Sequence, residues 1–196
     1  MEPKANRDYI AFADNKKIAS GDIIAVALKV KKYTKNYNES SILVFDQMTS
    51  HQVELDLRGT DEEVERRLTA LLEPEEKKCG PGRPKLGVVS KEVTLLPQHW
   101  EWLALQPGGA SVTLRKLIEE AKKKNSGKDQ IRQAQDAAYK FMHAIAGDFS
   151  NYEEALRALY AADFGQFQKM ISDWPKDIQK HILDIIEGIH GAGRKD

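Results

Sequence analysis

The sequence has few of the features that mark secreted or membrane proteins. It contains one cysteine in 196 residues, so an internal disulfide framework is excluded. Its longest apolar run, residues 23–28, is far too short to span a bilayer. The first ten residues, MEPKANRDYI, lack the apolar stretch of a secretory leader. We therefore expect a cytoplasmic protein that makes no contact with a membrane.

Motifs for catalysis are missing as well. No nucleophile elbow, P-loop or dinucleotide-binding glycine pattern occurs. The five histidines lack metal-ligand spacing with one another and with Cys79. The acids Asp46, Glu54 and Asp56 fit a turn and a solvated strand face better than a metal or catalytic cluster. We expect no enzymatic activity, no cofactor and no metal site.

Charge is balanced over the whole chain but unevenly distributed along it. Lys and Arg number 30, as do Asp and Glu, so the net charge is zero and indicates no partner. Residues 77–128 hold eleven basic and four acidic residues, a net charge of +7. Residues 53–76 hold nine acids and three bases, a net charge of −6. A basic segment of this kind is typical of a phosphate-binding module inside a neutral protein.

The basic segment contains a strand, helix, turn, helix pattern. Val89–Leu96 is rich in β-branched and aliphatic residues, as strands are. Pro97 suits the first turn of a helix, where its missing N–H costs nothing. The turn Pro107-Gly108-Gly109 ends that helix. Ser111 is a good N-cap for a second helix that extends to about Lys124.

This segment resembles the ribbon-helix-helix DNA-binding superfamily, most specifically at Gly109-Ala110-Ser111-Val112-Thr113-Leu114-Arg115. The resemblance implies that the strand pairs with its copy from a second chain and enters the major groove, while the second helix presents its N-terminus to a phosphate. The implied dimer contacts are apolar: Val93, Leu95, Trp100, Leu103, Leu114, Leu117 and Ile118. The implied DNA contacts are Lys91, Thr94, Ser111, Thr113, Arg115 and Lys116.

The sequence allows two registers for the strand. If Val93 and Leu95 point inward, Thr94 points outward beside Glu92, an acid that repels phosphate. If Thr94 and Leu96 point inward, the two faces are exchanged. The first register buries more apolar surface and is favoured. It predicts weakly sequence-specific DNA binding rather than tight recognition of one operator.

A basic arm precedes the strand. Residues 77–87 are rich in glycine and proline and contain no acid. Gly82-Arg83-Pro84-Lys85 resembles the core of an AT-hook, which lays an arginine along the minor groove of A·T-rich DNA. Pro81 stands where a full hook has an arginine, and a flexible basic linker is the alternative interpretation. Arg83 and Lys85 are the expected DNA contacts of this arm.

The remaining segments predict an α+β protein with separate regions on either side of the basic segment. Residues 1–75 predict a small α/β module in the order ββαββα. Its elements are strands at 9–13 and 16–20, a helix at 21–32, strands at 41–46 and 51–58, and a helix that a capping box at Thr60–Glu63 opens. Residues 76–89 form the arm and 90–128 the ribbon-helix-helix-like unit.

Residues 129–196 predict a bundle of helices. Gln130–Ala146 is the first, and a second capping box at Ser150–Glu153 opens the next. The last helix follows Asp173-Trp174-Pro175. The expected inward residues recur at helical spacing and are Ala134, Ala137, Ala138, Phe141, Ile145, Phe164, Phe167, Met170, Ile171, Ile178, Ile182, Ile185 and Ile186.

Taken whole, the chain also resembles an uncharacterised bacterial family, the domain of unknown function numbered 2239. Three stretches carry this resemblance: Leu55–Thr60, Gly82–Gly87 and His99–Gly109. It implies a bacterial origin and no particular activity. From the residues we expect a homodimeric transcriptional regulator or nucleoid-associated protein that binds DNA. The alternative is a non-enzymatic, antitoxin-like interaction module that uses the strand-helix-helix only to dimerise, with a protein partner for its N- or C-terminal region.

Overall fold

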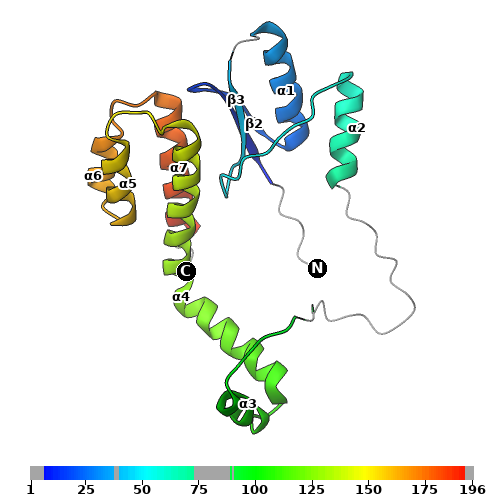
Figure 1. The fold of residues 1–196 in the computed structure, drawn as a ribbon, viewed down its shortest axis with the longest axis vertical. Coiled ribbons are helices and arrows are strands. Elements are labelled where there is room, and N and C mark those ends of the chain that lie inside the picture. The colour runs from blue at the N-terminus through cyan, green and yellow to red at the C-terminus, as the bar shows by residue number, and fades with distance from the viewer. Residues whose placement is uncertain (1–6, 38–39, 73–88, 90, 193–196) are drawn as a thin grey trace. The chain divides into compact units, whose positions relative to one another are not determined.

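The computed structural model describes residues 7–37, 40–72, 89 and 91–192. The chain divides into two compact units. One unit comprises residues 2–75 together with 130–196, and the other comprises residues 76–129. The described elements are β1 (Tyr9–Ala13), β2 (Lys16–Gly21), α1 (Ile23–Asn36), β3 (Ile42–Asp46), α2 (Asp61–Leu72), α3 (Pro97–Ala104), α4 (Gly109–Ile145), α5 (Tyr152–Tyr160), α6 (Phe164–Met170) and α7 (Lys176–Ala192) (Figure 1).

The larger unit is built on a three-stranded antiparallel sheet in the order β2-β1-β3. The central strand β1 is buried along its whole length. The expected hairpin is confirmed, with Asp14 at φ 50° in the turn between β1 and β2. Because side chains alternate across a strand, a fully buried central strand needs cover on both faces of the sheet.

One face of the sheet packs against α1. Tyr9 and Ala11 of β1 join Val44 of β3 and Val26 and Val30 of α1 in one buried cluster. Asp22 caps α1 by accepting hydrogen bonds from the Ile24 and Ala25 amides at 3.0 and 2.9 Å. This helix continues to Asn36, four residues beyond the expected end.

The opposite face of the sheet packs against the C-terminal helices. Ile10, Phe12 and Phe45 share a cluster with Phe141 of α4 and Ile178 of α7. The Phe141 ring lies 5.1 Å from both the Phe12 and the Phe45 ring, centroid to centroid. Most of the inward residues expected in the C-terminal segment are buried, and Ile145, Phe164 and Met170 are partly buried against the same cluster. The sheet and the helices therefore share one core. Residues predicted to form separate N- and C-terminal regions contribute to this same core.

Helix α2 begins as the sequence predicts. The Thr60 amide donates to the Glu63 carboxylate at 2.8 Å, and the Glu63 amide donates to Thr60 Oγ1 at 3.3 Å, which together make a capping box. The second predicted capping box is wrong. Asn151, the N-cap of α5, is in the left-handed conformation at φ 62° and makes no side-chain capping hydrogen bond.

The predicted fourth strand, His51–Arg58, does not form. Its only pairing in the described ranges is an isolated bridge between Gln52 and Phe45. The apolar alternation is real, since Val53, Leu55 and Leu57 lie against the cluster under α1. The segment leaves the sheet because Leu55 and Leu57 also pack against the cluster that contains Val64 and Leu68 of α2.

Two boundaries in the basic segment also differ from expectation. The second helix begins at Gly109 rather than after Ser111, and it continues without a break to Ile145. No proline interrupts residues 125–129, so backbone hydrogen bonding can continue through them. Residues 91–96 are not assigned as a strand in the single chain. The strand expected at Val89–Leu96 is therefore not observed among the described residues of this segment.

His181 on α7 supplies a pH-dependent contribution to stability. Its side chain is 2 % exposed, its Nε2 has no hydrogen-bond partner, and its ring lies 4.5 Å from the Phe141 ring and 5.6 Å from the Phe12 ring. Burial, together with the charge of Lys17, lowers the pKa of His181 to about 4. Protonation is therefore less favourable in the folded than in the unfolded chain.

We predict that His181 destabilises the protein in acid. The loss in free energy of unfolding is absent above the unfolded pKa of 6.5. It grows as the pH falls below that value and levels off near the folded pKa of about 4. At pH 5 the loss is roughly 2 kcal/mol relative to pH 7.5. Urea unfolding at pH 5 and at pH 7.5, on the natural chain and on His181→Leu, measures this loss. An equal loss of stability in both proteins would contradict this role.

Candidate nucleic-acid interface

The unit of residues 76–129 contains α3, a glycine turn and the first half of α4. Pro97 occupies the first turn of α3, as expected. Gly108 and Gly109 have φ of 87° and 72°, a region that favours glycine. A Cβ at Gly108 would lie 3.2 Å from the Val112 side chain, a tight contact that would require this side chain to shift slightly. Gly108 and Gly109 thus form the turn that joins α3 to α4.

Most of the apolar side chains of this unit are exposed in the single chain. Among its described residues only one apolar side chain is buried, that of Leu103, which is 2 % exposed. The large apolar side chains that are more than two-fifths exposed are Val89, Val93, Leu96, Trp100, Trp102, Leu105, Leu117 and Ile118. Leu95 and Leu114 are half-buried. Of the seven expected dimer contacts, six are therefore at least partly accessible.

The expected DNA contacts are found in two places on this unit. Lys91 and Thr94 lie in the extended segment before α3, and both are exposed. Ser111, Thr113, Arg115 and Lys116 lie in the first two turns of α4, where Thr113 is half-buried and the others are exposed. Arg115 Nε donates to the Ser111 carbonyl at 3.1 Å and keeps its terminal nitrogens available. Arg83, Lys85 and Cys79 lie outside the described residues.

Helical geometry separates the charges of α4 from its apolar residues. At 3.6 residues per turn, Leu114, Leu117, Ile118 and Ala121 share one side of the helix. The opposite side carries Arg115, Lys116, Lys122 and Lys123 together with two acids, Glu119 and Glu120. Glu119 is paired with Lys122 at 3.3 Å. One side of this helix is thus suited to apolar packing and the other to an anionic partner.

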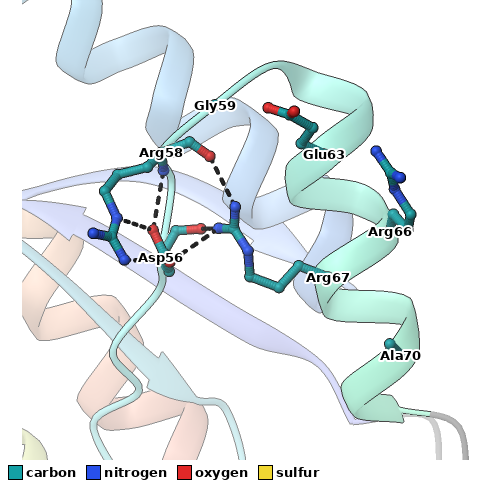
Figure 2. Close-up of a pocket in the computed structure, with 7 residues that line it drawn as sticks. All are labelled: Asp56, Arg58, Gly59, Glu63, Arg66, Arg67 and Ala70. Carbon is teal, nitrogen blue, oxygen red and sulfur yellow. Dashed lines mark hydrogen bonds and ion pairs between the residues drawn. The ribbon is translucent and has the colours of Figure 1, made fainter.

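A second candidate site lies in the larger unit, in a groove of about 590 Å³ beside α2. Figure 2 shows that Arg58 and Arg67 both point toward Asp56, whereas Arg66 points away on another side of α2. Arg58 makes two side-chain hydrogen bonds to the Asp56 carboxylate, each of 2.9 Å. These bonds to Arg58, followed by the charges of Arg58 and Arg67, hold the pKa of Asp56 well below its usual range.

Arg67 joins the segment before α2 to the helix itself. Its Nη1 donates to the Asp56 carbonyl, and its Nη2 donates to the Arg58 carbonyl at 3.0 Å. An ion pair of 3.2 Å joins Nη1 to the Asp56 carboxylate. Nearby, the buried Lys31 amine of α1 donates to the Gly59 carbonyl at 2.6 Å and pairs with Asp61 at 2.8 Å.

The chemistry of this groove is that of a structural clamp. Arg58 and Arg67 already face an acid or carbonyls, and the α2 N-terminus carries Asp61, Glu62 and Glu63, which repel a second anion. Nothing in it combines a nucleophile with a base. In the part of the chain that the structure describes, no three His, Cys, Asp or Glu side chains are grouped to hold a metal ion. Asp46, named above with Asp56, accepts the Met48 and Thr49 amides in a turn, as expected.

The two arginines of α2 offer a matched test of the clamp. Arg67→Ala removes two hydrogen bonds to backbone carbonyls and should lower the free energy of unfolding by about 1 kcal/mol. The exposed ion pair with Asp56 adds little to that value. Arg66→Ala removes an exposed neighbour that has no ion-pair partner in the described ranges, and it should change stability by less than about 0.5 kcal/mol. Urea unfolding of both variants measures the difference, and equal effects would contradict the clamp.

Comparison with known proteins assigns the whole chain to a family and gives no information on either site. No curated protein and no solved structure matches it. No helix among the residues described above is both long and apolar enough to cross a bilayer. A family model described as "Uncharacterized protein conserved in bacteria" matches residues 8–186. Since this match covers both units, the chain belongs to that bacterial family, the domain of unknown function numbered 2239.

Proposed function

We propose that the chain is a homodimeric DNA-binding protein, a transcriptional regulator or nucleoid-associated protein, that uses its central basic unit. The observation that carries the proposal is the exposure of apolar side chains in that unit. With Leu103 as the one buried apolar side chain among its described residues, this region has little core of its own to stabilise its packing. A second copy that supplies the same residues would give α3 and α4 a shared core.

The exposed area is large enough for such a dimer. The eight large apolar side chains between Val89 and Ile118 that are more than two-fifths exposed average somewhat over half exposed. The two tryptophans each offer about 150–250 Å² when free and the six aliphatic side chains offer less, so together the eight present on the order of 700 Å². That area is close to the roughly 800 Å² that each partner buries in a standard interface. Trp100 and Trp102 are of the residue type most enriched at interface hot spots.

The charge of the same unit supports nucleic acid as the ligand. With α3 and the apolar side of α4 packed in a dimer, Arg115 and Lys116 would remain on the solvent side of α4. In the favoured register Thr94 would lie on the outward face of the paired ribbon, with Lys91 at its start on the face of Val93, and Arg83 and Lys85 would lie on the arm just before it. Glu92 on the ribbon opposes phosphate, so backbone contacts should dominate and binding should be weakly sequence-specific. The arm adds a preference for A·T-rich duplexes.

Binding to fluorescent A·T-rich and G·C-rich duplexes over a salt series tests the proposal. Replacing both Arg115 and Lys116 by Ala should weaken binding at least tenfold and reduce the slope of log K against log salt by about 3 to 4, because two phosphate contacts are lost in each chain of the dimer. Arg83→Ala with Lys85→Ala should reduce the A·T preference. The control is Lys176→Ala with Lys180→Ala, two exposed lysines of α7, which removes the same charge and should leave affinity unchanged.

Two outcomes would contradict the proposal. Equal weakening by both pairs of substitutions would mean that net charge alone, and not this unit, determines binding. A dimer that binds no duplex at low salt would favour the alternative, a protein-interaction module in which the strand-helix-helix serves only to dimerise.

A further inference from the structure

The middle of α4 receives no support from tertiary packing. Every residue from 115 to 129 is exposed, and so are Ile131, Arg132 and Gln133. Leu114 is half-buried just before this stretch, and a buried face of the helix begins after it at Ala134. Helices in proteins owe most of their stability to an amphipathic face that packs, so this stretch depends on its own sequence.

That sequence is weakest at Asn125-Ser126-Gly127. All three residues have poor helix propensity, and Gly127 is the poorest of them. A Cβ at Gly127 would meet nothing within 4 Å, so close packing does not require a glycine there. Ser126 Oγ donates to the Lys123 carbonyl at 3.1 Å, a side-chain bond that weakens and bends helices.

Side-chain charges support the helix before this tripeptide and weaken it across the tripeptide. Before it, Glu119 pairs with Lys122 at 3.3 Å, and Glu119 and Glu120 are spaced to support Lys123 and Lys124. Across it, Lys124 and Lys128 stand four residues apart and repel each other. In the described ranges, neither of these two lysines forms an ion pair.

A second copy of the chain would not cover this stretch either. The apolar stripe of α4 runs from Leu114 to Ala121. The positions that continue its spacing are Asn125, Lys128 and Arg132, which are polar or charged. A partner that packs against the stripe would therefore leave residues 125–128 in water.

From these observations we infer that α4 contains a joint at Asn125–Lys128, a short segment that opens and recloses as a local helix–coil equilibrium while the helix on both sides of it stays formed. The joint lies within two residues of the boundary between the two compact units at Asp129 and Gln130. It makes α4 a jointed connector in place of a rigid rod. This inference stands whether or not the basic unit binds DNA.

Site-resolved amide hydrogen exchange on the full chain tests the joint. The amides of residues 126–131 should exchange at least tenfold faster than those of 138–142, in the buried part of the same helix, because local opening exposes them. They should also exchange faster than those of 117–122. Protection equal to that of 138–142 would overturn the joint. Uniformly fast exchange from 117 to 131 would overturn it too, since the whole stretch would then be frayed.

Variants identify the cause of the opening. Gly127→Ala should slow exchange at 126–131 about fivefold through helix propensity. Lys128→Glu should slow it about twofold or more, because it turns a repulsion with Lys124 into an attraction. Gln133→Ala, an exposed change in the same helix beyond the joint, is the control and should leave these rates unchanged within about twofold. If Gly127→Ala has no larger effect than the control, the joint is not located at this tripeptide.

Discussion

The organisation of the larger unit depends on the burial of one short strand on both of its faces. β1 is the middle strand of a three-stranded sheet, and each of its five residues is buried. Such a sheet has little area of its own, so each face needs a covering layer. Helix α1 covers the face of Ala11, and Phe141 and Ile178 cover the face of Phe12. The C-terminal helices must therefore return to the N-terminal strands, across the whole length of the chain.

The described residues of the smaller unit form no corresponding layer among themselves. Its apolar residues recur at helical spacing, as in helices that pack against a protein core. Yet Leu103 alone of those described is buried. The physical contrast between the two units is the basis of the proposed function. In the larger unit the chain provides its own second layer, and in the smaller one a second copy is proposed to provide it. The proposed DNA contacts depend on that packing, because it would leave Arg115 and Lys116 facing outward.

Short-range patterns in the sequence predicted much of the local structure. The β1–β2 hairpin, the capping box of Thr60 and Glu63 and the proline start of α3 all form where expected, since each depends on a few neighbouring residues. Periodicity also identified the inward isoleucines of α7. The predicted strand at 51–58 shows the limit of this reasoning. Its alternation correctly predicted which side chains face inward. The segment does not form a strand beside β3, because these side chains pack against α1 and α2 instead.

Long-range features could not be read from the sequence. The Asp56–Arg67 clamp joins residues eleven positions apart through backbone carbonyls, and only the alternation of Asp56 with Leu55 and Leu57 hinted at its orientation. The continuity of α4 was missed because Asn125, Ser126 and Gly127 favour a break. The structure keeps them helical, and this conflict between local preference and observed conformation is the reason for expecting a joint there.

Molar mass in solution tests the central claim most directly. Sedimentation equilibrium over micromolar concentrations should give twice 22.1 kDa for the natural chain. Replacing Leu117 and Ile118 together by Glu should give the mass of a single chain, because a charge cannot be buried unpaired in the proposed interface. Leu71→Glu, at a 75 % exposed position of α2, should leave the mass doubled. A natural chain of 22.1 kDa at every concentration would contradict the account, since its apolar side chains would then remain in water.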